Sequence, residues 1–437
     1  MIQKIGRKSK QKFELVYSEQ DNITGRAGLG LFDRVYEELG IGKDIKRLFS
    51  EPGSWNGYDA EKYIKPILMS MLGGGQYIED VNRTVKDEGL RKMLNLKQVP
   101  SSDAIGDWLR RESESKMEKI NEIIDKVNLE IMKRDKAEEY MLDIDASCIE
   151  SWKEGAKWTY KENKGYMPLL SYIRELDICI SNEFREGNES PRKENLEQIK
   201  ECVKKVKMSG KKLSYVRIDA AGYSEKIMNY CDDEKIKYTI SASRHENILE
   251  GIKNISEWKE INKRSGEKRE YGEMIGCMNN GAKSYRIVVE RKELEKDLLG
   301  VRYGYKCIAT NYDEENTGEE IIRKHEERGA SKNYHKELKR GFHLSYMPSG
   351  DFRGNGVWFS IGVLAYNMFI FLKRMILKGN WVKKTIERVR WELLNVSARI
   401  IEHSRKMVIR ISGVGAEIYE KLKEIYDWEL KEEEYIT

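Results

Sequence analysis

Two short apolar runs, each ending at an aspartate, constrain the fold of this chain more than any other feature. Residues 140–145 read YMLDID and residues 213–219 read LSYVRID. Such runs, followed by small residues, are typical of buried strands whose carboxyl ends present side chains to a ligand. Two carboxylates brought together cannot both stay ionised without a cation nearby, so Asp145 and Asp219 indicate a divalent metal.

The spacing of apolar residues changes along the chain. It is helical up to about residue 135, becomes strand-like with intervening helices, and is helical again in the last third. Strands alternating with helices predict a mixed α/β sheet. Strands are expected at 140–145, 174–180, 213–219 and 236–242, and a terminal strand pair at 398–401 and 406–411.

A run of consecutive strands interrupts this α/β pattern and contains an Asn-Gly step at 280–281, which is typical of a hairpin. We interpret it as a β-rich insertion. The expected regions are a helical N-terminal region (1–135), the first part of the α/β domain (136–249), the β-rich insertion (250–312), the second part of the α/β domain (313–380) and a mainly helical C-terminal region (381–437).

One apolar segment could belong to a membrane or to a protein core. No charged residue lies between Arg353 and Lys373, and residues 357–372 are mostly apolar, which is the lower limit for a spanning helix. The segment also holds Ser360 and Asn367, and no second candidate accompanies it. We therefore expect a buried core helix and no membrane partner.

Composition weighs against several classes of protein. The 79 basic and 74 acidic residues nearly cancel, so the net charge of +5 is weak evidence for a nucleic-acid partner. The six cysteines are widely spaced without a C-x-x-C pair, and the five histidines are scattered, which argues against a disulfide scaffold, a zinc knuckle or a histidine metal cluster. With no signal peptide in the first residues, a reducing cytoplasm fits best.

The N-terminal region holds one candidate DNA-reading element. A Ser/Asp cap at residues 101–103 leads, after a short turn, into a helix that ends in Arg110 and Arg111. This pattern is compatible with a helix-turn-helix reader. A helical bundle whose arginines are merely solvated fits it equally well.

A third element indicates what the metal would act on. Residues 317–339 have a helical pattern that puts His325, Arg328, Lys332 and Lys339 on one face, at offsets of 3, 7 and 14 from the histidine. This order resembles the Y-x2-R-x3-E-x6-K signature of the DDE transposases of bacterial insertion sequences. The group 1 DDE-domain transposases are the most similar, and the resemblance extends from about residue 20 to 412. Shared phrases are LDID at 142–145, GYMPLL at 165–170, RID at 217–219, KELK at 336–339, LAYN at 364–367 and SARII at 397–401.

The resemblance implies an RNase-H-like sheet with the first catalytic acid on the first strand and the second on the fourth. Asp145 matches the first acid and Asp219 the second, while Asp143 points to the same face as Asp145 and could support it. Such acids hold two Mg²⁺ (or Mn²⁺) ions about 3.5–4 Å apart, which cleave and rejoin phosphodiester bonds. The implied partners are double-stranded DNA (terminal inverted repeats and target DNA) and a second copy of the chain on paired DNA ends, in the bacterial cytoplasm with the nucleoid.

The third acid position departs from the family. Lys332 stands where the family has a glutamate, and lysine cannot ligate Mg²⁺. Glu326, Glu327 and Glu337 lie nearby, but about 120–140° off the required face of an ideal helix. The sequence leaves open an impaired transposase, a shifted third acid and a non-catalytic, transposase-derived DNA-binding protein. A nuclease or phosphatase unrelated to transposition would need the same missing acid.

Several side chains are expected to contact DNA. By the resemblance, Arg328 and Lys339 would contact phosphates beside the cut, and Arg110 and Arg111 are candidates in the N-terminal region. Trp258 and the tyrosines of the insertion are candidates to stack on an unpaired base. For Trp258, core packing is the alternative.

Overall fold

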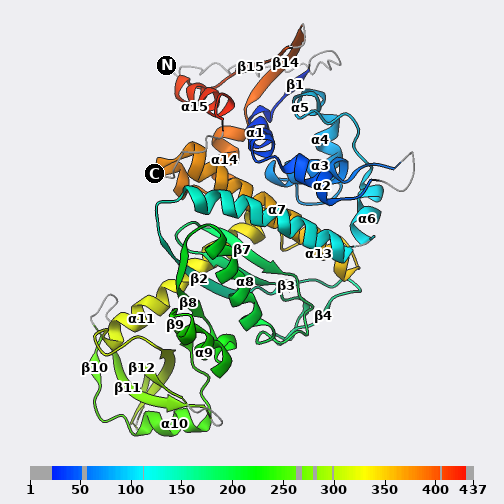
Figure 1. Cartoon of the computed structure of the whole chain (residues 1–437). Coiled ribbons are helices and arrows are strands. Elements are labelled where there is room, and N and C mark those ends of the chain that lie inside the picture. Colours follow the sequence, from blue (N-terminus) through cyan, green and yellow to red (C-terminus); the bar gives the residue numbers. More distant parts are fainter. Residues whose placement is uncertain are drawn as a thin grey trace, which may run out of the picture.

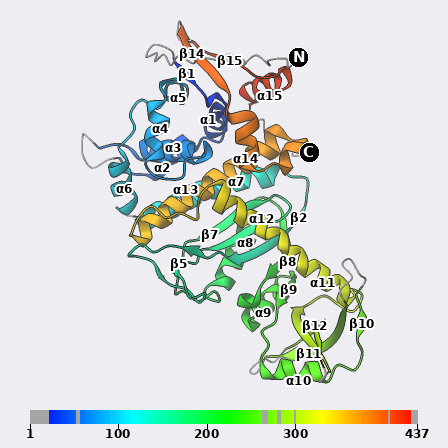
Figure 2. The same cartoon turned by 180° about the vertical axis from the view of Figure 1, so that it is seen from behind.

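A computed structural model describes residues 22–51, 57–111, 113–261, 268–278, 283–297, 300–403 and 406–429. One large mixed sheet runs from the middle of an elongated molecule to one of its ends, as Figures 1 and 2 show from opposite sides. The N-terminal helices and the C-terminal elements lie together at one end, and the β-rich insertion lies at the other. The mixed α/β class expected from the sequence is confirmed.

The strands that position the site are β2 (Glu139–Ala146), β6 (Leu169–Ile173), β7 (Ile178–Glu183), β8 (Lys212–Ile218) and β9 (Lys237–Ser241). β2, β8 and β9 are parallel to one another. On the other side of β2, β6 pairs antiparallel with β2, and β7 pairs antiparallel with β6. Parallel neighbours need a crossover connection. The helix α8 (Asn195–Met208) leads into β8, and α9 (Glu225–Asp233) joins β8 to β9. β2 and β8 therefore end at the same edge of the sheet.

The strands expected between 250 and 312 are present, and they extend the same sheet. They are β10 (Lys259–Glu260), β11 (Arg269–Cys277), β12 (Ser284–Asp297) and β13 (Gly300–Thr310), preceded by the helix α10 (Glu246–Lys253). β13 pairs antiparallel with β9, so that the sheet runs in the order β10-β11-β12-β13-β9-β8-β2-β6-β7. The Asn-Gly step at 280–281 lies outside the described residues.

One strand prediction is wrong. The sequence predicts a strand over 174–180, but residues 174–177 form a turn in which Asp177 has a φ of 60°, and β7 begins only at Ile178. β6 was not predicted, although all of its residues are buried. Its sequence, LLSYI, is buried on both faces and does not alternate between apolar and polar residues, so periodicity alone does not identify it as a strand.

The N-terminal region is helical, as expected. Its helices are α1 (Gly30–Glu38), α2 (Ile41–Leu48), α3 (Ala60–Leu72), α4 (Asp80–Lys86), α5 (Glu88–Met93), α6 (Ser102–Arg110) and α7 (Ser113–Arg134). The side chain of Ser101 caps α6 by accepting a hydrogen bond from the backbone of Ala104 at 3.2 Å. Residues 94–101 connect α5 to α6, which is longer than the tight turn of a helix-turn-helix unit. The local geometry favours the helical bundle.

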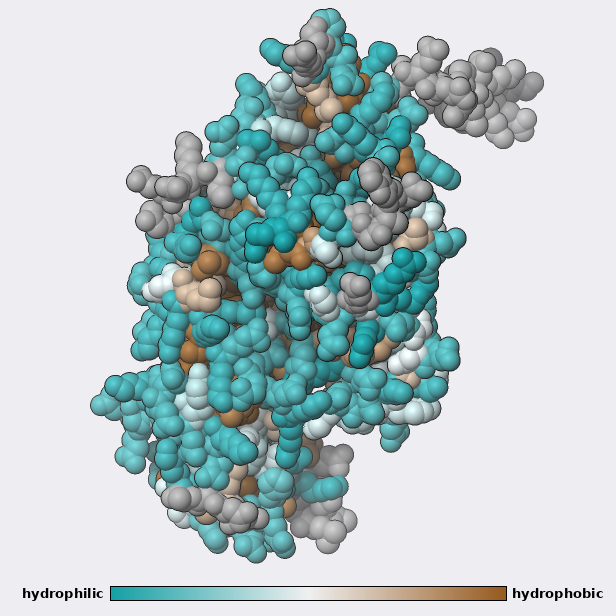
Figure 3. Space-filling model, turned by 45° about the vertical axis from the view of Figure 1, so that its right-hand side comes forward, coloured by the Kyte–Doolittle hydropathy of each residue, from teal (hydrophilic) through white to brown (hydrophobic). Residues whose placement is uncertain are grey.

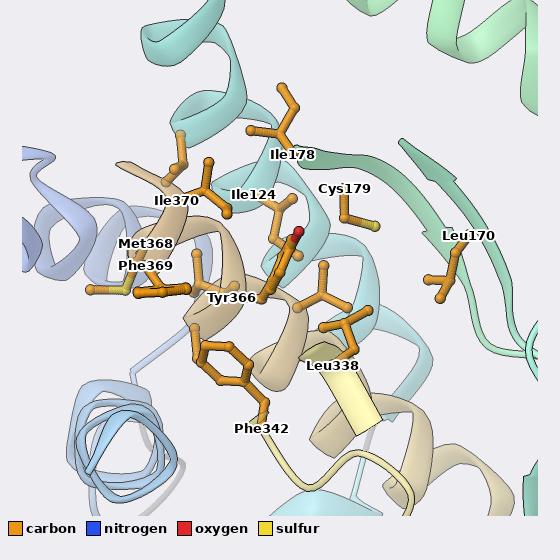
Figure 4. Packing of buried hydrophobic residues seen from close by; sticks show 14 of the residues in the cluster. Ile124, Leu170, Ile178, Cys179, Leu338, Phe342, Tyr366, Met368, Phe369 and Ile370 are labelled. Atoms are coloured by element: carbon orange, nitrogen blue, oxygen red, sulfur yellow. The ribbon is translucent and has the colours of Figure 1, made fainter. Parts of the chain in front are cut away.

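The apolar helix α13 (Phe352–Phe371) forms the centre of the core, where Tyr366 and Phe369 pack near Ile124 of α7 (Figure 4). With the π-helical turn Leu372–Leu377 it is long and apolar enough to cross a membrane, but its most apolar window is entirely buried in the protein, as in the core helix of a globular fold. Asn367 accepts a hydrogen bond from the backbone N–H of Cys179 (3.1 Å) and donates one to its carbonyl (2.8 Å). The helix thereby supplies hydrogen-bond partners for the backbone N–H and C=O of Cys179 in the edge strand β7.

The C-terminal strand pair is confirmed and joins the other end of the chain. β14 (Ser397–His403) pairs with β15 (Lys406–Ser412) and also with β1 (Ile23–Thr24), forming a separate sheet. The helices α14 (Ile386–Val389) and α15 (Ala416–Tyr426) flank it. The C-terminal region is therefore partly β and depends on the N-terminal strand.

Candidate functional site

A buried ion pair lies two residues before each of the strand-end aspartates. Asp143 and Arg217 are register partners in β2 and β8, joined by hydrogen bonds of 2.6 Å (Nε to Oδ1) and 2.7 Å (Nη2 to Oδ2). Their side chains are 1% and 0% exposed. Because side chains alternate along a strand, Asp145 and Asp219 project on the same face as this pair.

Asp145 lies at the end of β2, and Asp219 follows β8 directly. Asp219 begins a 3-10 turn, and its Oδ1 accepts a hydrogen bond from the backbone of Ala221 at 2.9 Å. Burial raises the pKa of Asp145 to about 6; the guanidinium of Arg328 opposes this rise and the charge of Asp219 adds to it. The register that pairs Ile144 with Ile218 puts the two aspartates at neighbouring positions where β2 and β8 end.

The third element is not one continuous α-helix. The helix α11 (Gly318–Glu326) begins at a capping box formed by Thr317 and Glu320 and is followed by a 3-10 turn (Glu327–Ala330). Then come α12 (Ser331–Lys336) and a π-helical turn (Glu337–Gly341). The expectation of one continuous helix is therefore wrong, because these turns change the rotation per residue. His325, Arg328 and Lys332 nevertheless line the same cleft.

Arg328 and Lys332 both lie at the cleft that contains Asp145. The Nη1 atom of Arg328 is 3.5 Å from Oδ1 of Asp145. Lys332 is exposed and, with both of these residues, lines a cleft of about 440 Å³. The position of the third acid therefore presents an ammonium group to the cleft.

None of the nearby glutamates completes a carboxylate triad. Glu290 and Glu326 line the cleft, but each pairs with Arg269 at 2.5 Å. Glu327 pairs with Arg174 at 2.6 Å, and Glu337 accepts a backbone hydrogen bond at 2.6 Å from the C-terminal region. Within the described ranges, no group of three or more His, Cys, Asp or Glu side chains is arranged to hold a metal ion.

His335, which the sequence analysis did not single out, lies beside Asp145. Its Nε2 is 3.6 Å from Oδ2 of Asp145. The ring is buried, burial lowers its pKa to about 4, and neither ring nitrogen has a hydrogen-bond partner in the part of the chain described here. The sequence pattern that could have identified His335 is its offset of three residues from Lys332, since residues three apart lie on the same side of a helix.

The comparison with protein families decides the identity. Residues 10–424 match the family described as "Transposase DDE domain group 1". The chain belongs to this family of DDE transposases. No curated protein matches the chain. Among solved structures, the cryo-EM structure of the piggyBac transposase synaptic complex with hairpin DNA is similar with a TM-score of 0.45, at 13% identity over 84% of this chain and 79% of that chain.

Two motif residues of this DDE-family chain have structural partners. The ring nitrogens of His325 lie 2.9 Å from Oγ of Ser241 and 3.1 Å from Oγ1 of Thr239, and burial lowers the pKa of the imidazole to about 3. The neutral ring fastens α11 to β9. Lys339 donates a hydrogen bond to the carbonyl of Cys148 at 2.6 Å, which holds the chain that follows β2.

The other expected DNA contacts of this DDE-family chain lie outside the cleft. Arg110 and Arg111 are exposed at the end of α6, and Arg110 pairs with Asp107 at 2.5 Å. Trp258 is half-buried: its Nε1 donates to a backbone carbonyl at 3.2 Å, and the guanidinium of Arg291 lies 4.0 Å from its ring centroid. This is the core-packing alternative.

Proposed function

We propose that the chain is a DNA transposase of a bacterial insertion sequence, which cleaves strands at terminal inverted repeats and transfers them to target DNA. The order β7-β6-β2-β8-β9 supports an RNase-H-like catalytic core, because it puts Asp145 on the first strand and Asp219 after the fourth. The observation that carries the proposal is the register of β2 and β8, which puts Asp145 and Asp219 at neighbouring strand ends, two residues beyond the buried Asp143–Arg217 pair.

Asp145 and Asp219 would hold the divalent cation, Mg²⁺ or Mn²⁺, that DDE transposases generally use. Their donor type fits, because carboxylate oxygens are the ligands that these hard cations prefer. The raised pKa of Asp145, caused by burial, also fits, because a bound cation stabilises a buried carboxylate. When bound, the metal would supply an activated oxygen nucleophile and neutralise charge on the phosphate.

The protein's own cations would position the DNA strand. Arg328 neutralises Asp145 in the free protein and is near enough to contact a phosphate at the same place. Lys332 adds a second cation to this cleft. Arginine and lysine contacts to phosphate fix the register of a strand without reading its sequence.

Because of Lys332, we also expect DNA cleavage to be slow. It cannot replace the ligand that a third carboxylate supplies, and its charge opposes a cation in the same cleft. We therefore propose tight binding of DNA ends with weak cleavage. The alternative, a non-catalytic transposase-derived DNA-binding protein, is favoured because, within the described residues, no three His, Cys, Asp or Glu side chains are grouped so that they could hold a metal ion.

The proposed partners are double-stranded DNA, both terminal inverted repeats and target, and a second copy of the chain that brings two DNA ends together. The proposed location is the cytoplasm, in association with the nucleoid. Arg110 and Arg111 are the proposed contacts of the N-terminal region, because both are exposed and cationic.

The test is cleavage of a labelled duplex made from the terminal inverted repeats that the proposal expects beside the gene. The natural protein should bind this duplex and cut it weakly in Mg²⁺ or Mn²⁺, and Asp145→Ala or Asp219→Ala should abolish the cutting. Robust cutting that survives both substitutions would reject the site. If neither the natural protein nor Lys332→Glu cuts while both bind, the non-catalytic alternative holds.

A further inference from the structure

An aromatic surface follows β2 directly. Residues 147–166, here called the aromatic flap, form a small sheet of β3 (Ile149–Glu150), β5 (Lys164–Tyr166) and β4 (Lys157–Trp158), in that order. Its side chains Trp152, Trp158 and Tyr160 are 73%, 57% and 62% exposed. The molecular face in Figure 3 is mostly hydrophilic, with small, separate apolar patches. Several large exposed aromatic side chains within one short segment therefore mark a binding surface.

The flap is held in place. The side chain of Lys153 donates a hydrogen bond to the carbonyl of Pro348 at 2.7 Å, and Asn163 donates one to Glu150 at 2.6 Å. Gly165 allows the strands to approach closely, since a Cβ there would lie 2.0 Å from the carbonyl oxygen of Ile149. The aromatic side chains are thus carried on an ordered scaffold, which lowers the entropy cost of binding.

Cations accompany the rings. The rings of Trp152 and Trp158 are 6.2 Å apart and nearly perpendicular, which leaves ring faces open to solvent. Lys164 Nζ lies 5.9 Å from the centroid of Trp158, and Lys161 Nζ lies 5.6 Å from that of Tyr160. Aromatic faces with ammonium groups beside them complement a single nucleic-acid strand, whose bases stack while its phosphates are neutralised.

The flap adjoins the candidate site. It begins at Ser147, two residues after Asp145. The Lys339 side chain contacts the flap at the carbonyl of Cys148. A strand that passes Asp145 therefore runs close to the flap.

We propose that the aromatic flap binds unpaired DNA bases next to the cleavage position, with Trp152, Trp158 and Tyr160 stacking on the bases and Lys161 and Lys164 facing the phosphates. The inference rests on the proposed function, because the flap would act on the strand that Asp145 and Asp219 cut. It assigns the stacking role to this flap and not to Trp258, whose ring is covered by Arg291.

The experiment measures the fluorescence anisotropy of three labelled DNAs with the full chain: a blunt terminal-repeat duplex, the same duplex with unpaired 3′ nucleotides, and the single strand. The natural protein should bind the duplex with unpaired 3′ nucleotides about tenfold or more tighter than the blunt duplex, since stacking on each unpaired base contributes to the binding free energy. The double variant Trp152→Ala/Trp158→Ala should lose this preference and still bind the blunt duplex as before. Trp391→Ala is the matched control, because Trp391 is also 73% exposed but lies in the C-terminal region.

The outcomes separate the two proposals. If the natural protein and the double variant prefer the duplex with unpaired 3′ nucleotides over the blunt duplex to the same degree, the role of the flap is overturned and the proposed function stands. Failure of the natural protein to bind any of the DNAs would overturn the proposed function itself. If the double variant keeps its DNA binding but loses self-association in sedimentation, the flap is an interface between copies, which contradicts the proposal. Circular dichroism checks that each variant is folded.

Discussion

The guanidinium of Arg217 holds the carboxylate of Asp143 through hydrogen bonds of 2.6 and 2.7 Å inside the central sheet. The same guanidinium donates from Nη1 to the carbonyl of Lys324 in α11 at 2.8 Å. One buried side chain therefore ties together β2, β8 and the helix that leads to Arg328. These are the elements that bring the candidate site together.

Removing one member of this pair should destabilise the protein strongly. Asp143→Ala leaves the buried guanidinium without its carboxylate, which costs about 3–5 kcal/mol of unfolding free energy. The double variant Asp143→Leu/Arg217→Met should recover most of this loss, because it removes both charges. Urea unfolding measures both effects, and Lys200→Ala, which breaks an exposed pair with Glu197, is the control. A loss as small as that of the control would contradict the account.

Asp145 should lower the stability of the metal-free protein at neutral pH. Its pKa, raised to about 6 mainly by burial, lies above the unfolded value, so the folded state binds the proton more tightly. Its contribution to stability is therefore full below about pH 4 and is lost as the pH rises through about 6. Asp145→Asn should stabilise the protein at pH 7 by on the order of 2 kcal/mol, with little effect at pH 4. Thermal unfolding at both pH values tests this; an equal effect at both would refute it.

Lys332 should limit cleavage in two separable ways. Lys332→Gln removes the opposing charge without adding a ligand, whereas Lys332→Glu does both. Cutting rates should therefore rise in the order Lys, Gln, Glu, and an increase of about tenfold corresponds to about 1.4 kcal/mol of activation free energy. Single-turnover cleavage of the terminal-repeat duplex measures the order. Equal rates for the three proteins would show that position 332 does not face the chemistry.

His335 should contribute little to the free energy of unfolding but should strengthen metal binding. A buried polar group without a partner costs about 1–3 kcal/mol, so His335→Leu should leave stability equal or higher. The same change should weaken Mn²⁺ binding about tenfold or more if the imidazole faces the ion, as its 3.6 Å distance from Asp145 suggests. Calorimetry gives both quantities, with His343→Asn as the control. A large loss of stability with unchanged Mn²⁺ affinity would make His335 a packing residue only.

The parts of the site that follow from local sequence could be predicted, and those that depend on distant contacts could not. Asp145 and Asp219 end apolar runs, and parallel strands bring such ends together whatever surrounds them. The single helix expected over residues 317–339 is instead interrupted by a 3-10 turn and a π-helical turn. The spacing of residues does not encode such interruptions.

The exposure of aromatic side chains and the pairing of buried charges could not be predicted from the sequence either. No sequence pattern singles out Trp152, and only the folded chain shows its ring exposed to solvent beside Trp158. The partner of Asp143 is 74 residues away, so no local pattern linked it to Arg217. β6 does not follow from the sequence pattern because it is buried on both faces and lacks the alternation of apolar and polar residues that marks a half-buried strand.

The most direct measurement is Mn²⁺ binding by electron paramagnetic resonance to the natural protein, Asp145→Asn, Asp219→Asn and the double variant. If the two carboxylates share a metal, each single change should weaken binding about tenfold or more, and the double change should cost less than the sum of the two. Asp313→Asn, at an exposed position, should change nothing. Mn²⁺ affinity that is the same in the natural protein and in both single variants would contradict the account.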